Sequence, residues 1–392
     1  MAAGLLTVSV GRVLQTLASA EPSDRPYGRL LPPDANGIRL PAGFVSRIIA
    51  RTGQVVGATG YVWHAWPDGG ACFPLANGRH AYVSNSELDA GTGGVSAVVF
   101  DVNGEITDAY RICSGTTRNC AGGATPWGTW MSGEEFEFGQ IYECDPTGQT
   151  PAVARPSLGT FRHEAGAVDP ATGIVYLTED EPDGRLYRFV PDASGSLASG
   201  QLYAATVDEQ QHVAWVVTSV DRRDQTSQTQ PFNGGEGIVV RGDTLFFATK
   251  GDKRIWSIDL ATSQLDVLHD CLARPTTALN AIDNLCVDPL SGDLYVAEDG
   301  GNLELCLLAE TPSGLVISPF LQFIGHDLSE VAGPAFSPDG TTLYVSSQRG
   351  SDGINGVTIA VTGPFRNRLR IDATSSIGDS PPVPRRSVTP NS

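Results

Sequence analysis

The sequence predicts an all-β fold, a six-bladed β-propeller, and three observations lead to this prediction. The chain of 392 residues contains 45 glycines and 26 prolines, which favours many short strands joined by turns over long helices. A unit of two apolar strands separated by a polar break recurs six times. The units follow one another at intervals of about 40 to 50 residues, a spacing typical of propeller blades.

The six units are seen in order along the chain, each opening on an apolar strand. They start at Ala81, at Gly128 and at Ile174, and directly after Thr244, Asp293 and Thr342. An aromatic residue marks the first strand of each unit: Tyr82, Trp130, Tyr176, Phe247, Tyr295 and Tyr344. These markers are 48, 46, 71, 48 and 49 residues apart. The regular spacing favours six blades over a seventh blade or an open sandwich.

The long third interval contains the polar stretch 221–230, which we expect to be a loop. Most units also have an additional strand before the marker strand, joined to it by a turn. Two of these turns share the pattern Asp-Pro-x-x-Gly, at residues 169–173 and 288–292. Proline and glycine are typical of hairpin turns, so each unit is predicted to contain an antiparallel hairpin.

An antiparallel hairpin places the start of its first strand beside the end of its second. This rule predicts four close pairs: Glu164 with Glu179, Asp283 with Glu298, Glu236 with Lys250, and Asp68 with Glu87. In a propeller the innermost hairpins surround the central channel. The acidic ends should therefore converge at one mouth of that channel.

The stretch IVYLTEDE, residues 174–181, shows why this mouth is chemically important. Converging carboxylates in a partly dry channel must be protonated, paired with Lys or Arg, or bound to a metal. The nearby cations are few, chiefly Lys250, Arg162 and Arg349. Calcium takes 6–8 oxygen ligands, so one or more Ca²⁺ ions would suit the site. The candidate ligands are Glu87, Glu134, Glu164, Glu179, Glu236, Asp283 and Glu298.

Other features carry less chemistry. Turn composition accounts for Glu135, Glu181 and Asp252, which lie one step further into their loops. His163 is a candidate base beside Glu164, although such a histidine more often only hydrogen-bonds to its neighbours. Seven cysteines form no CxxC pattern; Cys113 and Cys120 could close a small loop, but the odd number forbids full pairing. Free buried thiols are the expected state for most of them.

Charge and hydropathy exclude some partners. The formal net charge of −18 argues against nucleic acid and against anionic membrane surfaces. No segment reaches the roughly 18 apolar residues of a membrane span, so no membrane insertion is expected. We expect residues 1–26 to be either the remnant of an export signal or a short amphipathic helix, residues 27–370 to form the propeller domain, and residues 371–392 to be a disordered Pro- and Ser-rich tail.

Four long blocks of the sequence resemble the PhoX-type alkaline phosphatase family. They are NCAGGATPWGTWMSGEE, FRHEAGAVDPATGIVYLTEDE, DNLCVDPLSGDLYVAEDG and EVAGPAFSPDGTTLYVSSQ, and the likeness extends from about Tyr27 to about Gly363. The resemblance implies a six-bladed propeller with a calcium and iron cluster that hydrolyses small-molecule phosphomonoesters. It also implies export to the periplasm or the extracellular space. We expect the protein to be a monomer.

Position by position, the resemblance assigns metal binding to Glu164, Glu179, Glu236 and Glu298, and also to Glu87, Glu134 and Asp283. Two positions depart from the family pattern. The sequence around Gly133 is similar to that of active members, which carry an iron-binding cysteine at this position. The resemblance therefore implies Ca²⁺ as cofactor, and the glycine argues against Fe³⁺ beside it. Gly234 stands where they tend to carry an arginine that helps to clamp phosphate.

Three functions remain open from the sequence. The first is a metal-dependent phosphomonoesterase of the PhoX type, supported by the acidic ring and the family blocks. The second is a calcium-dependent propeller hydrolase of lactones or phosphotriesters, which the missing cysteine and arginine favour. The third is a non-catalytic scaffold stabilised by calcium, since a fold alone never proves activity. Hydrolysis of a phosphomonoester that depends on calcium would separate the first from the other two.

Overall fold

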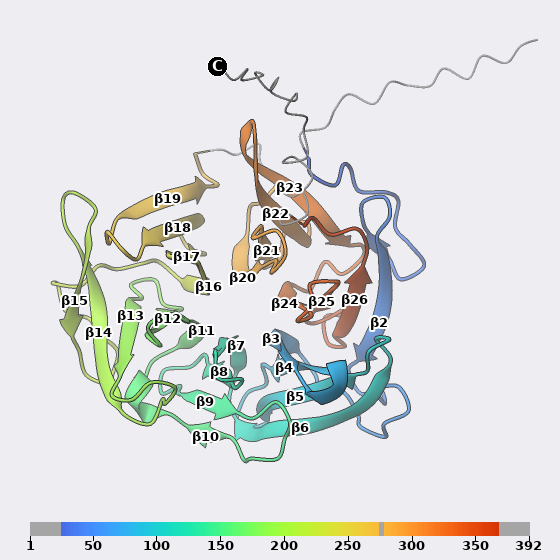
Figure 1. The fold of residues 1–392 in the computed structure, drawn as a ribbon, viewed down its shortest axis with the longest axis horizontal. Coiled ribbons are helices and arrows are strands. Elements are labelled where there is room, and N and C mark those ends of the chain that lie inside the picture. Colours follow the sequence, from blue (N-terminus) through green and yellow to red (C-terminus); the bar gives the residue numbers. More distant parts are fainter. Residues whose placement is uncertain (1–24, 274–277, 368–392) are drawn as a thin grey trace, which may run out of the picture.

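A computed structural model describes residues 25–273 and 278–367. Six small antiparallel sheets stand in a ring around a central opening (Figure 1). The prediction of an all-β, six-bladed propeller is therefore confirmed. The expected segments 1–26 and 371–392 lie outside the described residues, apart from Arg25 and Pro26. Among the described residues, no helix is long and apolar enough to cross a membrane.

In each of the first three blades, the strands lie in sequence order from the centre of the ring outwards. Blade 1 consists of β3 (Pro67–Pro74), β4 (His80–Ser86), β5 (Gly93–Phe100) and β6 (Ile106–Thr116). Blade 2 consists of β7 (Asn119–Ala124), β8 (Trp130–Glu134), β9 (Ile141–Cys144) and β10 (Val153–Ala154). Blade 3 consists of β11 (His163–Val168), β12 (Val175–Glu179), β13 (Leu186–Pro191), β14 (Gly200–Val207) and β15 (Val213–Val217). Two short 3₁₀ turns, η1 (Ala76–Gly78) and η2 (Pro156–Leu158), join strands in this half.

The last three blades repeat the pattern. Blade 4 consists of β16 (Gly235–Arg241), β17 (Thr244–Thr249), β18 (Arg254–Asp259) and β19 (Leu265–Asp270). Blade 5 consists of β20 (Ile282–Val287), β21 (Leu294–Glu298), β22 (Glu304–Thr311), β23 (Gly314–Phe323) and β1 (Ile38–Arg39). Blade 6 consists of β24 (Val331–Phe336), β25 (Thr342–Ser347), β26 (Val357–Thr362) and β2 (Val45–Arg51). The stretch 221–230 is a loop, as expected.

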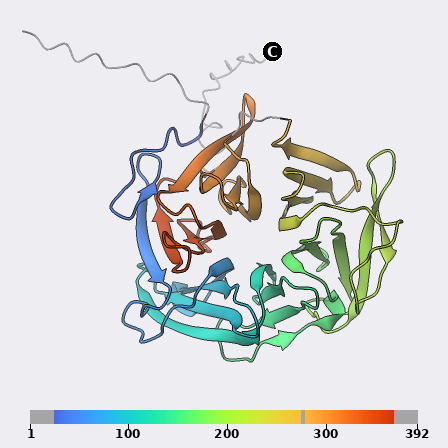
Figure 2. The same ribbon diagram turned by 180° about the vertical axis from the view of Figure 1, so that it is seen from behind.

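Strands from both ends of the chain close the ring. β2, from the start of the propeller, pairs with β26, from its end, through the register Val45↔Thr362 to Arg51↔Val357. Figures 1 and 2 show the blue strand beside the red one from both sides. An N-terminal strand thus completes the last blade by main-chain hydrogen bonds, and the chain then continues into the first blade.

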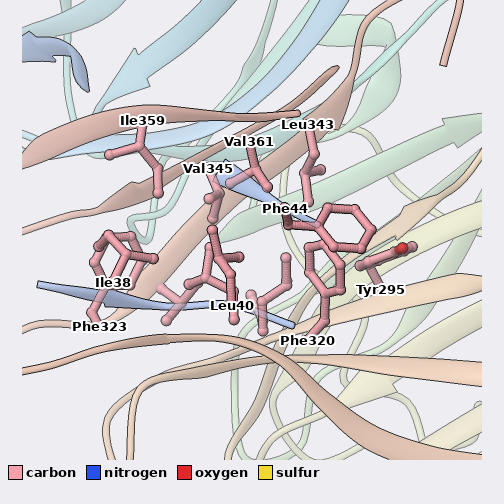
Figure 3. Packing of buried hydrophobic residues seen from close by; sticks show 14 of the residues in the cluster. Ile38, Leu40, Phe44, Tyr295, Phe320, Phe323, Leu343, Val345, Ile359 and Val361 are labelled. Carbon is pink, nitrogen blue, oxygen red and sulfur yellow. The ribbon is translucent and has the colours of Figure 1, made fainter. Parts of the chain in front are cut away.

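Six hydrophobic clusters fill the spaces between adjacent blades, one at each interface. Figure 3 shows the cluster between blades 5 and 6, where Phe44, Tyr295 and Phe320 pack against aliphatic side chains of β25 and β26. All six aromatic markers of the sequence repeat are buried on the second strand of their blades. The repeat in the sequence is therefore the repeat of this inter-blade packing.

The innermost strands share a second feature, a β-bulge near the same end. In each of these six strands the register with its partner shifts by one residue, as between Pro67 and Gly70 or between His163 and Gly166. A bulge places two residues opposite one, bends the strand and redirects the side chain at the bulge. The bulges therefore decide which side chains enter the channel.

Glycines allow the bulged strands to approach one another. A Cβ atom on Gly237 would lie 2.3 Å from the backbone nitrogen of Leu285 in the next blade. On Gly333 it would lie 2.4 Å from the carbonyl oxygen of Asp68, and the φ of Gly333 is +60°. Backbone atoms of a neighbouring blade cannot move aside as a flexible side chain can, so these positions require glycine.

We expect Gly237→Ala to destabilise the protein by about 1–3 kcal/mol, because the added methyl group forces the β16 and β20 backbones apart. Gly166→Ala is the matched control on another innermost strand. Its Cβ would meet the side-chain ends of Leu177 and Met131 at 3.1 and 3.2 Å, which can shift. Urea unfolding of both variants measures the difference, and equal midpoints would contradict the argument.

Candidate metal centre

The bulges direct five potential metal ligands towards the axis of the ring. In five blades the bulge begins at an equivalent residue of the innermost strand. In blade 3, for example, His163 pairs with Glu179 at the end of β12, and the bulge begins at the next residue, Glu164. These five residues are Asp68, Cys120, Glu164, Glu236 and Asp283. In blade 6 the same position is Ala332, which follows Val331, the partner of Ser347. A common backbone position thus supplies four carboxylates and one thiol to one mouth of the channel.

A second set of equivalent residues lies just beyond the second strand of each blade. In all six blades the backbone N–H of this residue donates to the carbonyl oxygen two residues before the bulge position, at 2.7–3.2 Å. The six residues are Glu87, Glu135, Asp180, Lys250, Asp299 and Gln348. They form an outer ring around the bulge residues, and four of the six are acidic.

The side chains gather into three groups whose ligand atoms lie within 4.8 Å of one another. The groups are Glu164, Glu236 and Asp283; Cys120, Glu135 and Glu164; and Asp68, Glu87 and Glu330. Glu164 belongs to two groups. Its side chain is 1% exposed, and its Oε1 has no hydrogen-bond partner among the described residues. A buried carboxylate oxygen without a partner, amid other oxygens and a thiol, fits a bound cation.

The electrostatics of these groups also favour a cation. Burial, together with the nearby Asp283 and Glu135 carboxylates, raises the pKa of Glu164 well above its ordinary value. Burial raises the pKa of Asp283 to about 7, and burial with Asp180 and Glu87 raises that of Glu135 to about 7. The pKa of Asp68 is raised well above its ordinary value by burial and by Glu330, Glu87 and Asp283. The acids of different groups therefore act on each other, and the three groups form one site.

Four of the seven predicted ligands lie in these groups: Glu87, Glu164, Glu236 and Asp283. The predicted pair of Glu236 with Lys250 is present, with the ammonium 2.7 Å from Oε1. The predicted proximity of Asp68 and Glu87 is also present, because both belong to one group. Two of the four pairs expected from hairpin geometry are therefore present, whereas Glu179 and Glu298 lie outside the groups that contain Glu164 and Asp283.

The other three predicted ligands, Glu134, Glu179 and Glu298, lie outside the three groups. Each ends the second strand of its blade, and each carboxylate accepts the backbone N–H of the residue six positions later, at 2.8–3.2 Å. Glu134 also accepts the N–H of Thr117, and Glu298 that of Asn280. Side chains alternate along a strand, so these glutamates brace the loops at the mouth while their neighbours face the channel.

His163 does not face the site. Its ring is completely buried and lies 3.8 Å from the ring centroid of Phe161, with Nε2 3.1 Å from the carbonyl oxygen of Gly159. Burial lowers the pKa of His163 to about 3, so the imidazole is neutral. The side chain is part of the packing between blades 2 and 3, and the structure gives no support to the role of base expected for it.

Sequence reasoning did not include Asp68, Cys120, Glu135 and Glu330 among the candidate ligands, although all four belong to the three groups. Turn composition explains Glu135 in the sequence, and Cys120 is there only a possible partner of Cys113 in a small loop. All seven cysteines are free, and the Cys120 Sγ lies 3.6 Å from a carboxylate oxygen of Asp68. One signal was available: four of the five bulge residues, Asp68, Cys120, Glu164 and Glu236, each precede glycine or alanine.

The structure also changes the meaning of Gly133. A Cβ atom at this position would point between blades, 2.9 Å from the carbonyl oxygen of His163. The thiol in the site is supplied by the innermost strand of the same blade, at Cys120. Although position 133 has no cysteine, the site therefore still contains a thiol, that of Cys120.

Three cations border the acidic groups. Arg349 lies 3.3 Å from Glu330 and 3.7 Å from Glu87. Arg162 lies 3.4 Å from Glu135. The third cation, Lys250, lies 2.7 Å from Glu236. Their side chains are 29%, 34% and 42% exposed, so each ammonium or guanidinium group lies at the boundary between the carboxylates and solvent.

Comparisons with known proteins identify the family and the fold of the chain. A family model described as alkaline phosphatase PhoX matches residues 90–138, 136–245 and 248–350. No curated protein sequence matches the chain significantly. Among solved structures, Pseudomonas fluorescens PhoX in complex with vanadate, a transition state analogue, is similar with a TM-score of 0.69 and 18% identity, over 85% of this chain and 97% of that one.

A Xanthomonas campestris gluconolactonase is also similar, with a TM-score of 0.50 and 14% identity, over 87% of this chain and 99% of that one. At these identities the structural likeness shows the propeller fold. The family match, by contrast, covers most of the blades that carry the acidic groups.

Proposed function

Because the chain belongs to the alkaline phosphatase PhoX family, we propose that it is a metal-dependent phosphomonoesterase with its metal ions in the three acidic groups. The observation that carries the proposal is the buried, unpartnered Glu164 at the point where two groups meet. Lysine and arginine at the edge of these groups are too few to neutralise them. A phosphatase site needs this arrangement, because phosphate oxygens must be met by positive charge.

The chemistry of the donors supports two kinds of ion. The groups Glu164, Glu236, Asp283 and Asp68, Glu87, Glu330 offer oxygen ligands alone, which suits Ca²⁺. The group Cys120, Glu135, Glu164 adds a thiol, and a soft sulfur ligand suits a transition metal such as iron. Bound metal ions would supply Lewis acidity towards phosphate oxygens and lower the pKa of an attacking water.

The residues of the chain prepare the site for this chemistry. The glycine-lined innermost strands fix the bulges, and the bulges hold the ligands at one level of the channel. Behind this level a cavity of about 370 Å³ is lined mostly by glycine, alanine and other small or apolar residues. The substrate would enter from the mouth, where the three cations lie.

We place the protein in the periplasm or outside the cell, acting as a monomer on small phosphoesters. The acidic surface implied by a net charge of −18 supports a function away from nucleic acids. The family supports export, and the site is complete within one chain, since the three groups are formed by residues of a single propeller.

The proposed function is tested by hydrolysis of an aryl phosphomonoester with calcium, with calcium and iron, and after chelation. We expect activity that disappears on chelation and returns with metal. A lactone and a phosphotriester serve as substrate controls. The phosphomonoesterase proposal would be contradicted if the calcium-loaded protein hydrolysed no substrate, or hydrolysed only the lactone or the phosphotriester.

Cys120→Ser tests whether the thiol binds a transition metal. Loading the wild-type protein with Co²⁺ is expected to produce a thiolate-to-metal charge-transfer band, because a coordinating thiol loses its proton. The band should disappear in Cys120→Ser while calcium binding persists. Cys286→Ser is the matched control, since Cys286 lies on the innermost strand β20 and outside the groups. A band that survives in Cys120→Ser would exclude Cys120 as the ligand.

A further inference from the structure

The backbone around Gly234 shows what has replaced the arginine expected there. Gly234 has a φ of +69°, and its carbonyl oxygen accepts the backbone N–H of Lys250 at 2.7 Å. A Cβ atom on Gly234 would lie 3.7 Å from the Cβ of Lys250. The side chain of Lys250 therefore starts beside the place from which a side chain at position 234 would start.

Lys250 is also an exception within the outer ring. Of the six equivalent residues in the described blades, it alone is a cation; the others are Glu87, Glu135, Asp180, Asp299 and Gln348. Its Nζ lies 2.7 Å from Glu236 and 3.2 Å from Asp180. The ammonium thus contacts a carboxylate that belongs to the buried group of Glu164, Glu236 and Asp283.

Lys250 and a metal ion must compete for Glu236. A divalent cation in this group would use the oxygens of Glu236 as ligands, and the attraction that holds the ammonium on Glu236 would weaken. The Lys250 side chain is 42% exposed, so a change of rotamer can carry the ammonium away from Glu236 on its solvent side. Its three N–H donors would then lie beside the metal, where a phosphate oxygen must bind.

Resting on the proposed function, we propose that Lys250 is the phosphate-binding cation of this site and is released for that role when metal binds Glu236. Its ligand is the dianionic phosphate group of a phosphomonoester or of inorganic phosphate. Lysine binds phosphate as a point charge and does not need the planar geometry of arginine. The order of binding follows: the metal binds first and phosphate second.

The test is calorimetric titration of inorganic phosphate into the protein, with and without calcium. Wild-type protein loaded with calcium should bind phosphate, and the metal-free protein should bind it at least tenfold more weakly. Lys250→Met should bind calcium as tightly as the wild type or more tightly, because the competing ammonium is gone. Its affinity for phosphate in the calcium-loaded state should fall about tenfold or more.

Arg254→Met is the matched control. Arg254 is similarly exposed and ion-paired, but with Asp252 and Asp270, which lie outside the groups. It should leave both affinities unchanged. If Lys250→Met binds calcium more tightly and phosphate equally well, Lys250 is only a counter-ion and the proposal is overturned.

Two further results complete the test. Lys250→Arg keeps the charge and should bind phosphate within a few-fold of the wild type, which covers the case in which Lys250→Met does not fold; a loss as large as that expected for the methionine variant would overturn the proposal. Wild-type protein that binds calcium and then phosphate, yet hydrolyses no ester, would refute the phosphomonoesterase function and leave the role of Lys250 standing. Calcium-loaded protein that does not bind phosphate refutes the role of Lys250.

Discussion

Glu164→Gln is expected to remove most of the stabilisation by calcium and to reduce phosphomonoester hydrolysis by roughly a hundredfold or more. Glu164 supplies a ligand to two of the three groups, so one substitution weakens two metal positions. Glutamine has nearly the same size and keeps one oxygen, but it lacks the negative charge that a divalent cation requires. The fold itself should persist, because Glu164 forms no ion pair that holds the blades together among the described residues.

Glu134→Gln provides the control for this prediction. Glu134 is also a glutamate at the channel mouth, and the family resemblance had assigned it to metal. Its carboxylate instead accepts the backbone N–H groups of Thr117 and Gln140. We expect this variant to lose about 1–3 kcal/mol of stability and to keep its response to calcium. Thermal unfolding with calcium and with chelator measures both variants. A normal calcium response in Glu164→Gln would contradict the placement of the metal.

The second large effect is a pH-dependent loss of stability in the absence of metal. The folded protein raises the pKa of Asp283 and Glu135 to about 7, whereas both groups titrate near 4 in an unfolded chain. Between about pH 4 and pH 7 the folded state therefore binds more protons than the unfolded state. By linkage, the stability of the metal-free protein falls as pH rises through this window, and the contribution is lost above pH 7.

Calcium should reverse this trend. Metal binding displaces protons from carboxylates, so calcium affinity rises with pH. At a free concentration of 100 times Kd, calcium stabilises a protein by about 2.7 kcal/mol, which corresponds to a rise in Tm on the order of 5 °C. We expect a small calcium effect at pH 5 and a large one at pH 8, measured by thermal unfolding in matched buffers. A calcium effect that is equal at both pH values would contradict the raised pKa values.

The fold was predictable from the sequence because the inter-blade packing is repeated in it. Each aromatic marker, from Tyr82 to Tyr344, occupies the same buried position in its blade. Because this position recurs in every blade, the aromatic residues recur along the sequence at nearly regular intervals. The hairpin rule was equally physical, and it placed Glu236 beside Lys250 correctly. These features depend on strand periodicity and turn chemistry, which are local properties.

The candidate site was only partly predictable, because two local effects decide which side chains face the channel. Because side chains alternate along a strand, the carboxylate of Glu179 points towards a loop, whereas the next residue, Asp180, belongs to the outer ring. The bulge then directs Glu164 and Cys120 inwards, and a bulge depends on how closely two blades approach. Glycines such as Gly237 are present in the sequence where two blades approach closely, but the atoms that they contact are known only from the assembled ring.

The proposed function requires metal ions in the acidic groups formed by the bulged strands. Anomalous X-ray scattering from crystals grown with calcium and a transition metal tests it most directly. We predict peaks among Glu164, Glu236 and Asp283, and a transition-metal peak beside Cys120. Peaks at Glu134, Glu179 and Glu298, or no peak at the channel mouth in protein shown to bind metal, would contradict the account.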